Sequence, residues 1–153
     1  MCRGGGQVRQ RATESIVVNA PPQDVFSVVI DVERYVEWVS EVKSIEVIER
    51  DAVGRPLEVE FRAAAFGRST TYALRYDYGR APDELNWYQA AGDITADLRG
   101  QYRFEPIDGA TNVVYDLEVD LAVPIPAFVK ARAAHRIQSE ALRDLKDRVE
   151  SLR

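Results

Sequence analysis

Apolar and polar residues alternate with a period of two through most of residues 42 to 123. Because the side chains of a β-strand point alternately to opposite faces, this pattern is typical of strands with one covered and one solvated face. Turn sequences at 66–68, 81–83, 92–93 and 108–109 separate the runs and favour antiparallel connections. The alternation therefore predicts an antiparallel sheet, one face of which needs a cover.

A long amphipathic segment at the C-terminus can supply this cover. Pro126 suits the start of a helix, and a stripe at spacings of three and four follows it. The stripe consists of Phe128, Ala131, His135, Gln138, Leu142, Leu145, Val149 and Leu152.

Two short helices are predicted after a first strand over residues 14–19. Pro21 and Pro22 suit the first turn of one helix, and Asp31 can cap the second. The order of elements predicts an α+β fold, in which a curved antiparallel sheet of about seven strands wraps around the long C-terminal helix.

The chain has 153 residues, which is the length of one ordinary domain. We expect a single domain over residues 13–153, preceded by a disordered extension over residues 1–12, which are rich in Gly and Arg. Cys2 and His135 are single residues of their kinds, so the sequence predicts neither a disulfide framework nor a metal site, and it points to no cofactor. No run reaches the ~18 apolar residues of a membrane span, and no signal peptide is evident, so the expected location is the cytoplasm.

Acidic residues dominate the body of the chain. Of the formal net charge of −5, residues 13–125 hold 10 basic and 21 acidic residues, whereas residues 126–153 hold 7 basic and 4 acidic ones. An acidic surface repels a phosphate backbone, so no nucleic-acid partner is expected.

Aromatic residues gather on the inward face of the predicted sheet, which holds five of the seven tyrosines. A buried tyrosine hydroxyl needs a hydrogen-bond partner, so this face predicts a cavity that holds water or a ligand with polar groups. The alternative is that several hydroxyls reach solvent at strand ends. The candidate ligand-binding residues are Trp38, Phe61, Tyr72, Leu74, Tyr76, Trp87, Tyr102, Phe104, Tyr115, Phe128 and His135.

Three further residues have a possible role at this cavity. His135 lies on the predicted helix stripe and is a weak catalytic candidate, because imidazole exchanges protons near neutral pH; the alternative is a hydrogen-bonded residue at the core edge. Phe66 and Gly67 form an apolar hairpin tip, which suggests a gate over the cavity mouth. A tip packed on a neighbouring loop is the alternative.

Short motifs along residues 13–151 resemble the START-like, helix-grip superfamily, and within it the polyketide cyclase/dehydrase and coenzyme Q-binding-like proteins. They are found at residues 20–26, 31–38, 100–102, 104–106, 109–111 and 124–126, and at Trp87, Val113 and Tyr115. Val36 stands where the family usually has Pro. The resemblance implies a deep apolar cavity between sheet and C-terminal helix, entered near the hairpin loops and the short helices, but it implies no particular reaction.

Three functions are compatible with this sequence. The first, which we favour, is binding or carriage of a hydrophobic small molecule (a lipid, quinone or polyketide-like compound) by a protein that is not an enzyme. The second is an aromatic polyketide cyclase/dehydratase, in which His135 or a tyrosine moves protons. The third is a protein or ribosome interaction module. In each case we expect a monomer or a weak homodimer.

Overall fold

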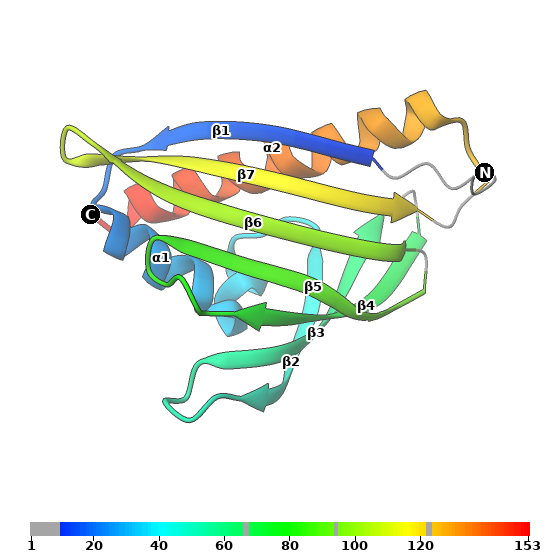
Figure 1. The fold of residues 1–153 in the computed structure, drawn as a ribbon, viewed down its shortest axis with the longest axis horizontal. Coiled ribbons are helices and arrows are strands. Elements are labelled where there is room, and N and C mark those ends of the chain that lie inside the picture. The colour runs from blue at the N-terminus through cyan, green and yellow to red at the C-terminus, as the bar shows by residue number, and fades with distance from the viewer. Residues whose placement is uncertain (1–9, 66–67, 94, 122–123) are drawn as a thin grey trace.

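The computed structural model describes residues 10–65, 68–93, 95–121 and 124–153. Within these residues, one antiparallel sheet has the strand order β1-β7-β6-β5-β4-β3-β2. Its strands are β1 Gln10–Val18, β2 Val42–Arg50, β3 Pro56–Ala65, β4 Arg68–Asp77, β5 Glu84–Gly92, β6 Thr95–Ile107 and β7 Ala110–Leu121. Between β1 and β2 lie the helix α1 (Pro22–Ile30) and the 3-10 helix η1 (Val32–Glu37), and the chain ends with α2 (Ala127–Ser151). The predicted α+β helix-grip fold is confirmed (Figure 1).

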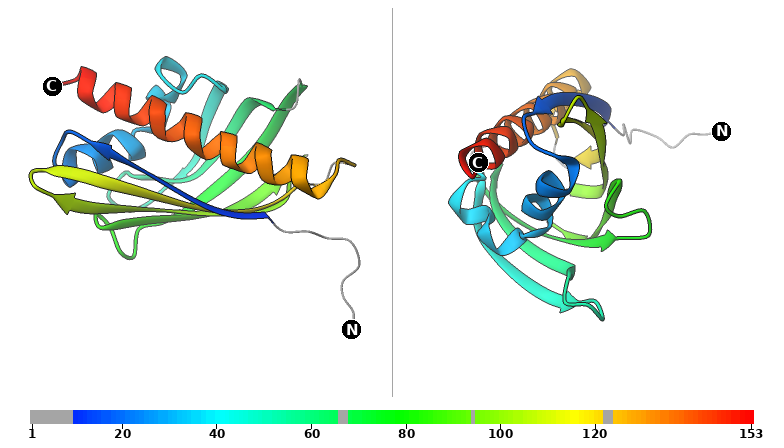
Figure 2. Two further views of the ribbon diagram at one scale, coloured as in Figure 1. Left: turned by 90° about the horizontal axis from the view of Figure 1, so that it is seen from above. Right: turned by 90° about the vertical axis from the view of Figure 1, so that its left-hand side faces the viewer.

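The sheet curls around α2, which lies along the β1 edge of its concave face. Figure 2 (right) shows the sheet curving from β1, beside the helix, round to β2. The helix contacts mainly β1 and, to a lesser extent, β7. The two edge strands, β1 and β2, therefore lie at opposite sides of a concave space.

The N-terminal strand begins earlier than predicted. Residues 10–12, which we expected in a disordered extension, pair with residues 117–119 of β7. Backbone pairing accounts for this, since a polar segment at a sheet edge still satisfies its amides and carbonyls there. The rest of the predicted extension lies outside the described residues.

The start of η1 also differs from expectation. Asp31 makes no side-chain capping hydrogen bond, and its carboxylate instead lies 3.2 Å from Arg34 Nε.

The buried face of α2 agrees with the predicted stripe only from Gln138 to Val149, and Leu152, the last residue of the stripe, is exposed. Ala134, Gln138, Leu142, Leu145 and Val149 are buried. In the N-terminal half, the predicted Phe128, Ala131 and His135 are exposed. Ala134 is the buried residue of this turn, so His135 and Ala131 point towards solvent.

Gly100 on β6 makes room for the indole of Trp87. The two residues are register partners in neighbouring strands, and a Cβ atom added at Gly100 would lie 2.2 Å from Trp87 Cε2 and Cζ2. The absence of a side chain on β6 therefore lets the indole lie across this strand, where its ring centroid is 5.0 Å from that of Tyr102.

We predict that Gly100→Ala lowers the free energy of unfolding by about 1–3 kcal/mol, because the new methyl group overlaps the indole. Urea denaturation measures the loss. In a Trp87→Leu background the same substitution should cost much less. An equal cost in both backgrounds would mean that the Gly100–Trp87 contact is not the cause.

Candidate functional site

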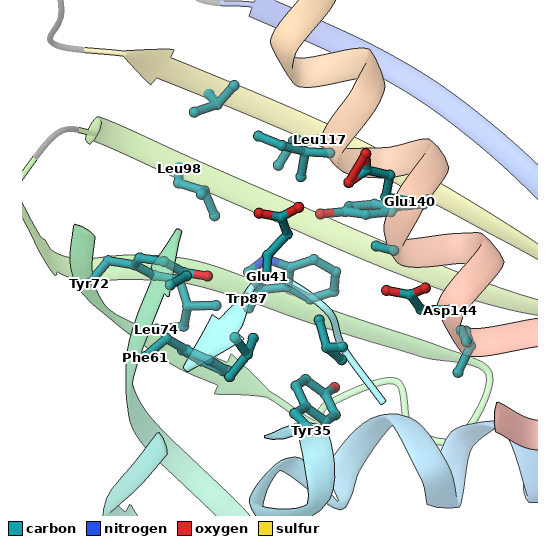
Figure 3. Close-up of a pocket in the computed structure, with 18 of the residues that line it drawn as sticks. Tyr35, Glu41, Phe61, Tyr72, Leu74, Trp87, Leu98, Leu117, Glu140 and Asp144 are labelled. Atoms are coloured by element: carbon teal, nitrogen blue, oxygen red, sulfur yellow. The ribbon is translucent and has the colours of Figure 1, made fainter. Parts of the chain in front are cut away.

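A cavity of about 640 Å³ lies between the concave face of the sheet and α2 (Figure 3). The strands contribute large apolar and aromatic side chains, whereas α2 contributes smaller ones. The lining includes Phe61, Leu74, Leu85, Trp87, Leu98, Leu117 and Val119 from the sheet, Val129, Ala133, Ile137, Ala141 and Leu145 from α2, and Val29, Tyr35 and Trp38 from the short helices and the residue that follows.

The alternation of side chains along the strands brings the aromatic rings into this cavity. Trp87 lies at the centre of the group, with ring centroids 5.0 Å from Tyr102, 5.7 Å from Tyr115 and 6.3 Å from Tyr76. Such tilted and edge-on pairs stabilise the rings beyond the burial of their area alone. The aromatic wall is therefore a preformed surface.

Most of the predicted ligand-binding residues line the cavity. They are Trp38, Phe61, Tyr72, Leu74, Tyr76, Trp87, Tyr102 and Tyr115. The seven of them that lie on strands all face inward, as the alternation predicts. Ligand binding by these residues stays a prediction.

Three of the residues predicted to bind the ligand do not line the cavity. Phe104 is buried, but its ring packs edge-on against Phe26 at 5.9 Å. Phe128 is 66% exposed near the start of α2. The His135 side chain is 59% exposed, and its Nδ1 lies 2.7 Å from Glu14 Oε2 on β1, outside the cavity lining. The expectation that His135 faces the interior is therefore wrong. The suggested gate residues, Phe66 and Gly67, lie outside the described residues.

The tyrosine hydroxyls fall into two groups. Tyr78 donates a 2.5 Å hydrogen bond to the Pro56 carbonyl, and its ring lies under the Arg55 guanidinium, so its hydroxyl is engaged at a strand end. The other four predicted tyrosines have hydroxyls without a hydrogen-bond partner among the described residues: Tyr72, Tyr76, Tyr102 and Tyr115.

Burial keeps these four phenols protonated. Desolvation raises the pKa of Tyr72 to about 12, and it raises the pKa of Tyr76, Tyr102 and Tyr115 as well. A protonated phenol donates a hydrogen bond and carries no charge. At neutral pH the cavity thus offers uncharged hydrogen-bond donors in an apolar wall.

The sequence interpretation missed Tyr35 and a group of charged residues at the cavity mouth. Tyr35 on η1 donates a hydrogen bond to the Val29 carbonyl, and its ring packs edge-on against Trp38. The charged lining residues are Glu41, Arg132, Arg136, Glu140 and Asp144. The sequence pointed to Tyr35 only through its position three residues before Trp38, about one helical turn away. The charged residues come together only in the folded chain, so no local pattern indicates them.

Comparison with known proteins assigns the family. Residues 9–150 match the family described as polyketide cyclase / dehydrase and lipid transport. The chain belongs to this family. No curated protein matches it by sequence.

Solved structures of this family's fold are similar over nearly the whole chain. A START superfamily protein from Mycobacterium smegmatis has a TM-score of 0.88 at 23% identity, over 94% of this chain and 99% of that one. The Zhui aromatase/cyclase from Streptomyces sp. R1128 has a TM-score of 0.80 at 18% identity, over 94% of both chains. A ginseng major latex-like protein from Panax ginseng has a TM-score of 0.70 at 10% identity, over 92% of this chain and 97% of that one. At such identities the likeness establishes the fold.

Among the described residues, no helix combines the length and apolar character that a membrane crossing needs.

The buried phenols predict a loss of stability in alkali. A tyrosine with a raised pKa stays protonated in the folded state, while the unfolded chain ionises near pH 10, so each such residue weakens folding by up to about 1.4 kcal/mol per pH unit above that value. For Tyr72 this loss runs from pH 10 to about 12. Urea denaturation across this range measures it.

A matched pair of variants provides the control. Tyr72→Phe should make the alkaline loss shallower, whereas Tyr88→Phe, on an exposed ring, should leave it unchanged. Equal slopes for the wild type and Tyr72→Phe would contradict the predicted burial effect.

Proposed function

We propose that this chain binds a hydrophobic small molecule in the cavity between the sheet and α2. The observation that carries the proposal is an apolar cavity of about 640 Å³ whose wall holds four tyrosine hydroxyls that have no hydrogen-bond partner among the described residues. Ligand pockets of proteins have volumes of roughly 300–1,000 Å³, apolar walls and a few placed polar groups. A lipid, a quinone or a polyketide-like compound combines these properties.

The energetic argument favours a ligand that is partly oxygenated. Burial of apolar area contributes roughly 25 cal/mol per Å² to binding, and it is opposed by the cost of immobilising the ligand. A buried hydroxyl left without a partner costs about 1–3 kcal/mol, so carbonyl or ether oxygens of the ligand would stabilise the complex at the four tyrosines. A pure hydrocarbon would leave that cost in place.

A second candidate function is cyclisation or dehydration of a polyketide-like chain. It is supported by the family assignment and by the fold shared with the Zhui aromatase/cyclase. His135 can no longer be its proton carrier, because it lies outside the cavity lining. The groups left for that role are the tyrosines and the mouth carboxyls Glu41 and Glu140. Conversion of a poly-β-keto substrate, analysed by mass spectrometry, tests this function. The interaction-module alternative stays an untested prediction.

Filling the cavity tests the main proposal. Ala133 lines the cavity and Ala131 is exposed on the same helix. We expect Ala133→Trp to weaken binding of the neutral fluorescent probe N-phenyl-1-naphthylamine by more than about tenfold, because an indole would occupy the ligand's space. Ala131→Trp should bind the probe as the wild type does. Equal binding by both variants would contradict a cavity site. Mass spectrometry of an organic extract of the purified protein would identify a retained ligand.

His135 offers a separate prediction. We expect His135→Ala to change the affinity for the same probe by less than about twofold, because its imidazole pairs with Glu14 outside the cavity. Trp87→Ala, which removes the centre of the aromatic wall, is the positive control. A large loss of affinity in His135→Ala with an intact fold by circular dichroism would contradict this placement.

A further inference from the structure

Polar side chains join the segment after η1 to α2 at the cavity mouth. Ser40 donates from its backbone N and its Oγ to Asp144 Oδ2, at 3.2 and 2.9 Å. Next to it, the carboxyl groups of Glu41 and Glu140 lie within hydrogen-bond reach of each other. Figure 3 shows Glu41, Glu140 and Asp144 converging on the same side of the cavity. All three are part of the cavity lining.

Among the described residues, no cation forms an ion pair with Glu41. Arg136 Nε lies 2.9 Å from Glu140 Oε2, and its side chain is largely exposed. Lys43 and Arg143 contribute only at longer range, and Arg132 makes no ion pair among the described residues.

The two carboxyls of the pair accordingly titrate differently. Desolvation and the neighbouring Glu140 raise the pKa of Glu41, while the hydrogen bond from Arg136 lowers the pKa of Glu140. When both are ionised, Glu41 and Glu140 repel each other, and a hydrogen-bond donor between their oxygens stabilises the pair.

The inner end of the cavity has the opposite chemistry. Tyr76 and Tyr115 are only 7% and 6% exposed, and their hydroxyls have no partner among the described residues. These protonated phenols donate to acceptors deep in the cavity, whereas the mouth presents three carboxyl groups beside Arg132 and Arg136. A ligand carboxylate would be buried without a cation at the inner end and would meet carboxyl groups at the outer end.

We propose that the Glu41–Glu140 pair, with Asp144, selects ligands whose outer end is a hydrogen-bond donor, a hydroxyl or an amine, and disfavours ligands that end in a carboxylate. The inference rests on the proposed function, because it assigns the headgroup of the molecule that the cavity holds. A hydroxyl or amine hydrogen between the two carboxyls offsets their mutual repulsion. Asp144 remains anchored by Ser40 and adds to the negative potential around that headgroup.

Three amphiphiles with one tail and different headgroups test the proposal. Dodecylamine, dodecanol and laurate, each below its aggregation concentration, compete with N-phenyl-1-naphthylamine at neutral pH. For the wild type, the amine and the alcohol should each compete about tenfold or more better than laurate, which is the effect expected of one like-charge contact near a protein surface. In Glu41→Gln/Glu140→Gln, the gap between amine and laurate should shrink to about threefold or less.

Two controls separate headgroup selection from damage to the fold. Dodecanol should bind the double variant about as well as the wild type, because a glutamine oxygen still accepts a hydrogen bond. Glu46→Gln, on an exposed side chain of β2 outside the cavity lining, should keep the wild-type order of headgroups.

The possible failures are distinguishable. If neither the probe nor any amphiphile binds, the proposed cavity function fails and this inference fails with it. If the probe binds but laurate competes as well as dodecylamine, the cavity function stands and the headgroup proposal is overturned. Loss of that laurate binding in Arg132→Ala would identify the guanidinium as the group that selects the headgroup.

Discussion

One buried amide, that of Gln138, fixes the position of α2 relative to the sheet. Its Nε2 donates to the carbonyl oxygens of Ala12 at 2.8 Å and Tyr115 at 2.9 Å, so one side chain joins the helix to both β1 and β7. Losing these bonds would cost about 0.5–1.5 kcal/mol each. Lys146 adds a 2.8 Å bond to the Val17 carbonyl further along the same edge. These contacts hold α2 against the β1 edge.

The cavity is a consequence of this off-centre helix. A sheet that curves from β1 round to β2 encloses more space than one helix at its edge can fill, since a helix with its side chains is only about 10 Å wide. On the sheet side, Trp87 fills part of the space because Gly100 admits its indole. On the helix side, Ala133 and Ala141 leave space unfilled. The volume of the cavity therefore depends on small residues that face large ones.

The strand pattern predicted the aromatic wall, and the helix pattern did not predict its opposite side. A period of two allows two faces only, so the inward positions of Tyr72, Tyr76 and Tyr102 followed directly from the alternation. An α-helix that borders both a sheet and a cavity has two adjacent inward stripes, here those of Ala134 and Ala133. The sequence alone cannot separate them, and His135 belongs to neither.

The charged residues at the cavity mouth could not be predicted from the sequence, for a different reason. Ser40 and Asp144 are separated by 104 positions, and their hydrogen bond exists only because the segment after η1 reaches α2 in the folded chain. Glu41 is exposed and precedes an ordinary strand, so nothing local distinguishes it from a solvated charge. Such contacts depend on which residues of α2 face the cavity. The sequence determines this rotation of the helix about its axis less well than any other feature of the fold.

The fold places charge and polarity where each can be tolerated. Rigid aromatic rings carry their hydroxyls to the cavity wall with little loss of conformational entropy, and burial keeps them uncharged, so the interior gains donors without the large cost of an isolated ion. The carboxyl groups lie at the mouth, where solvent and Arg136 offset their charge. Because the two ends differ in chemistry, a ligand with an acceptor at one end and a donor at the other can bind well in one direction only. In the proposed complex, the orientation of the ligand would be set by the same two features that produce the cavity, the side-chain alternation of the strands and the rotation of α2 about its axis.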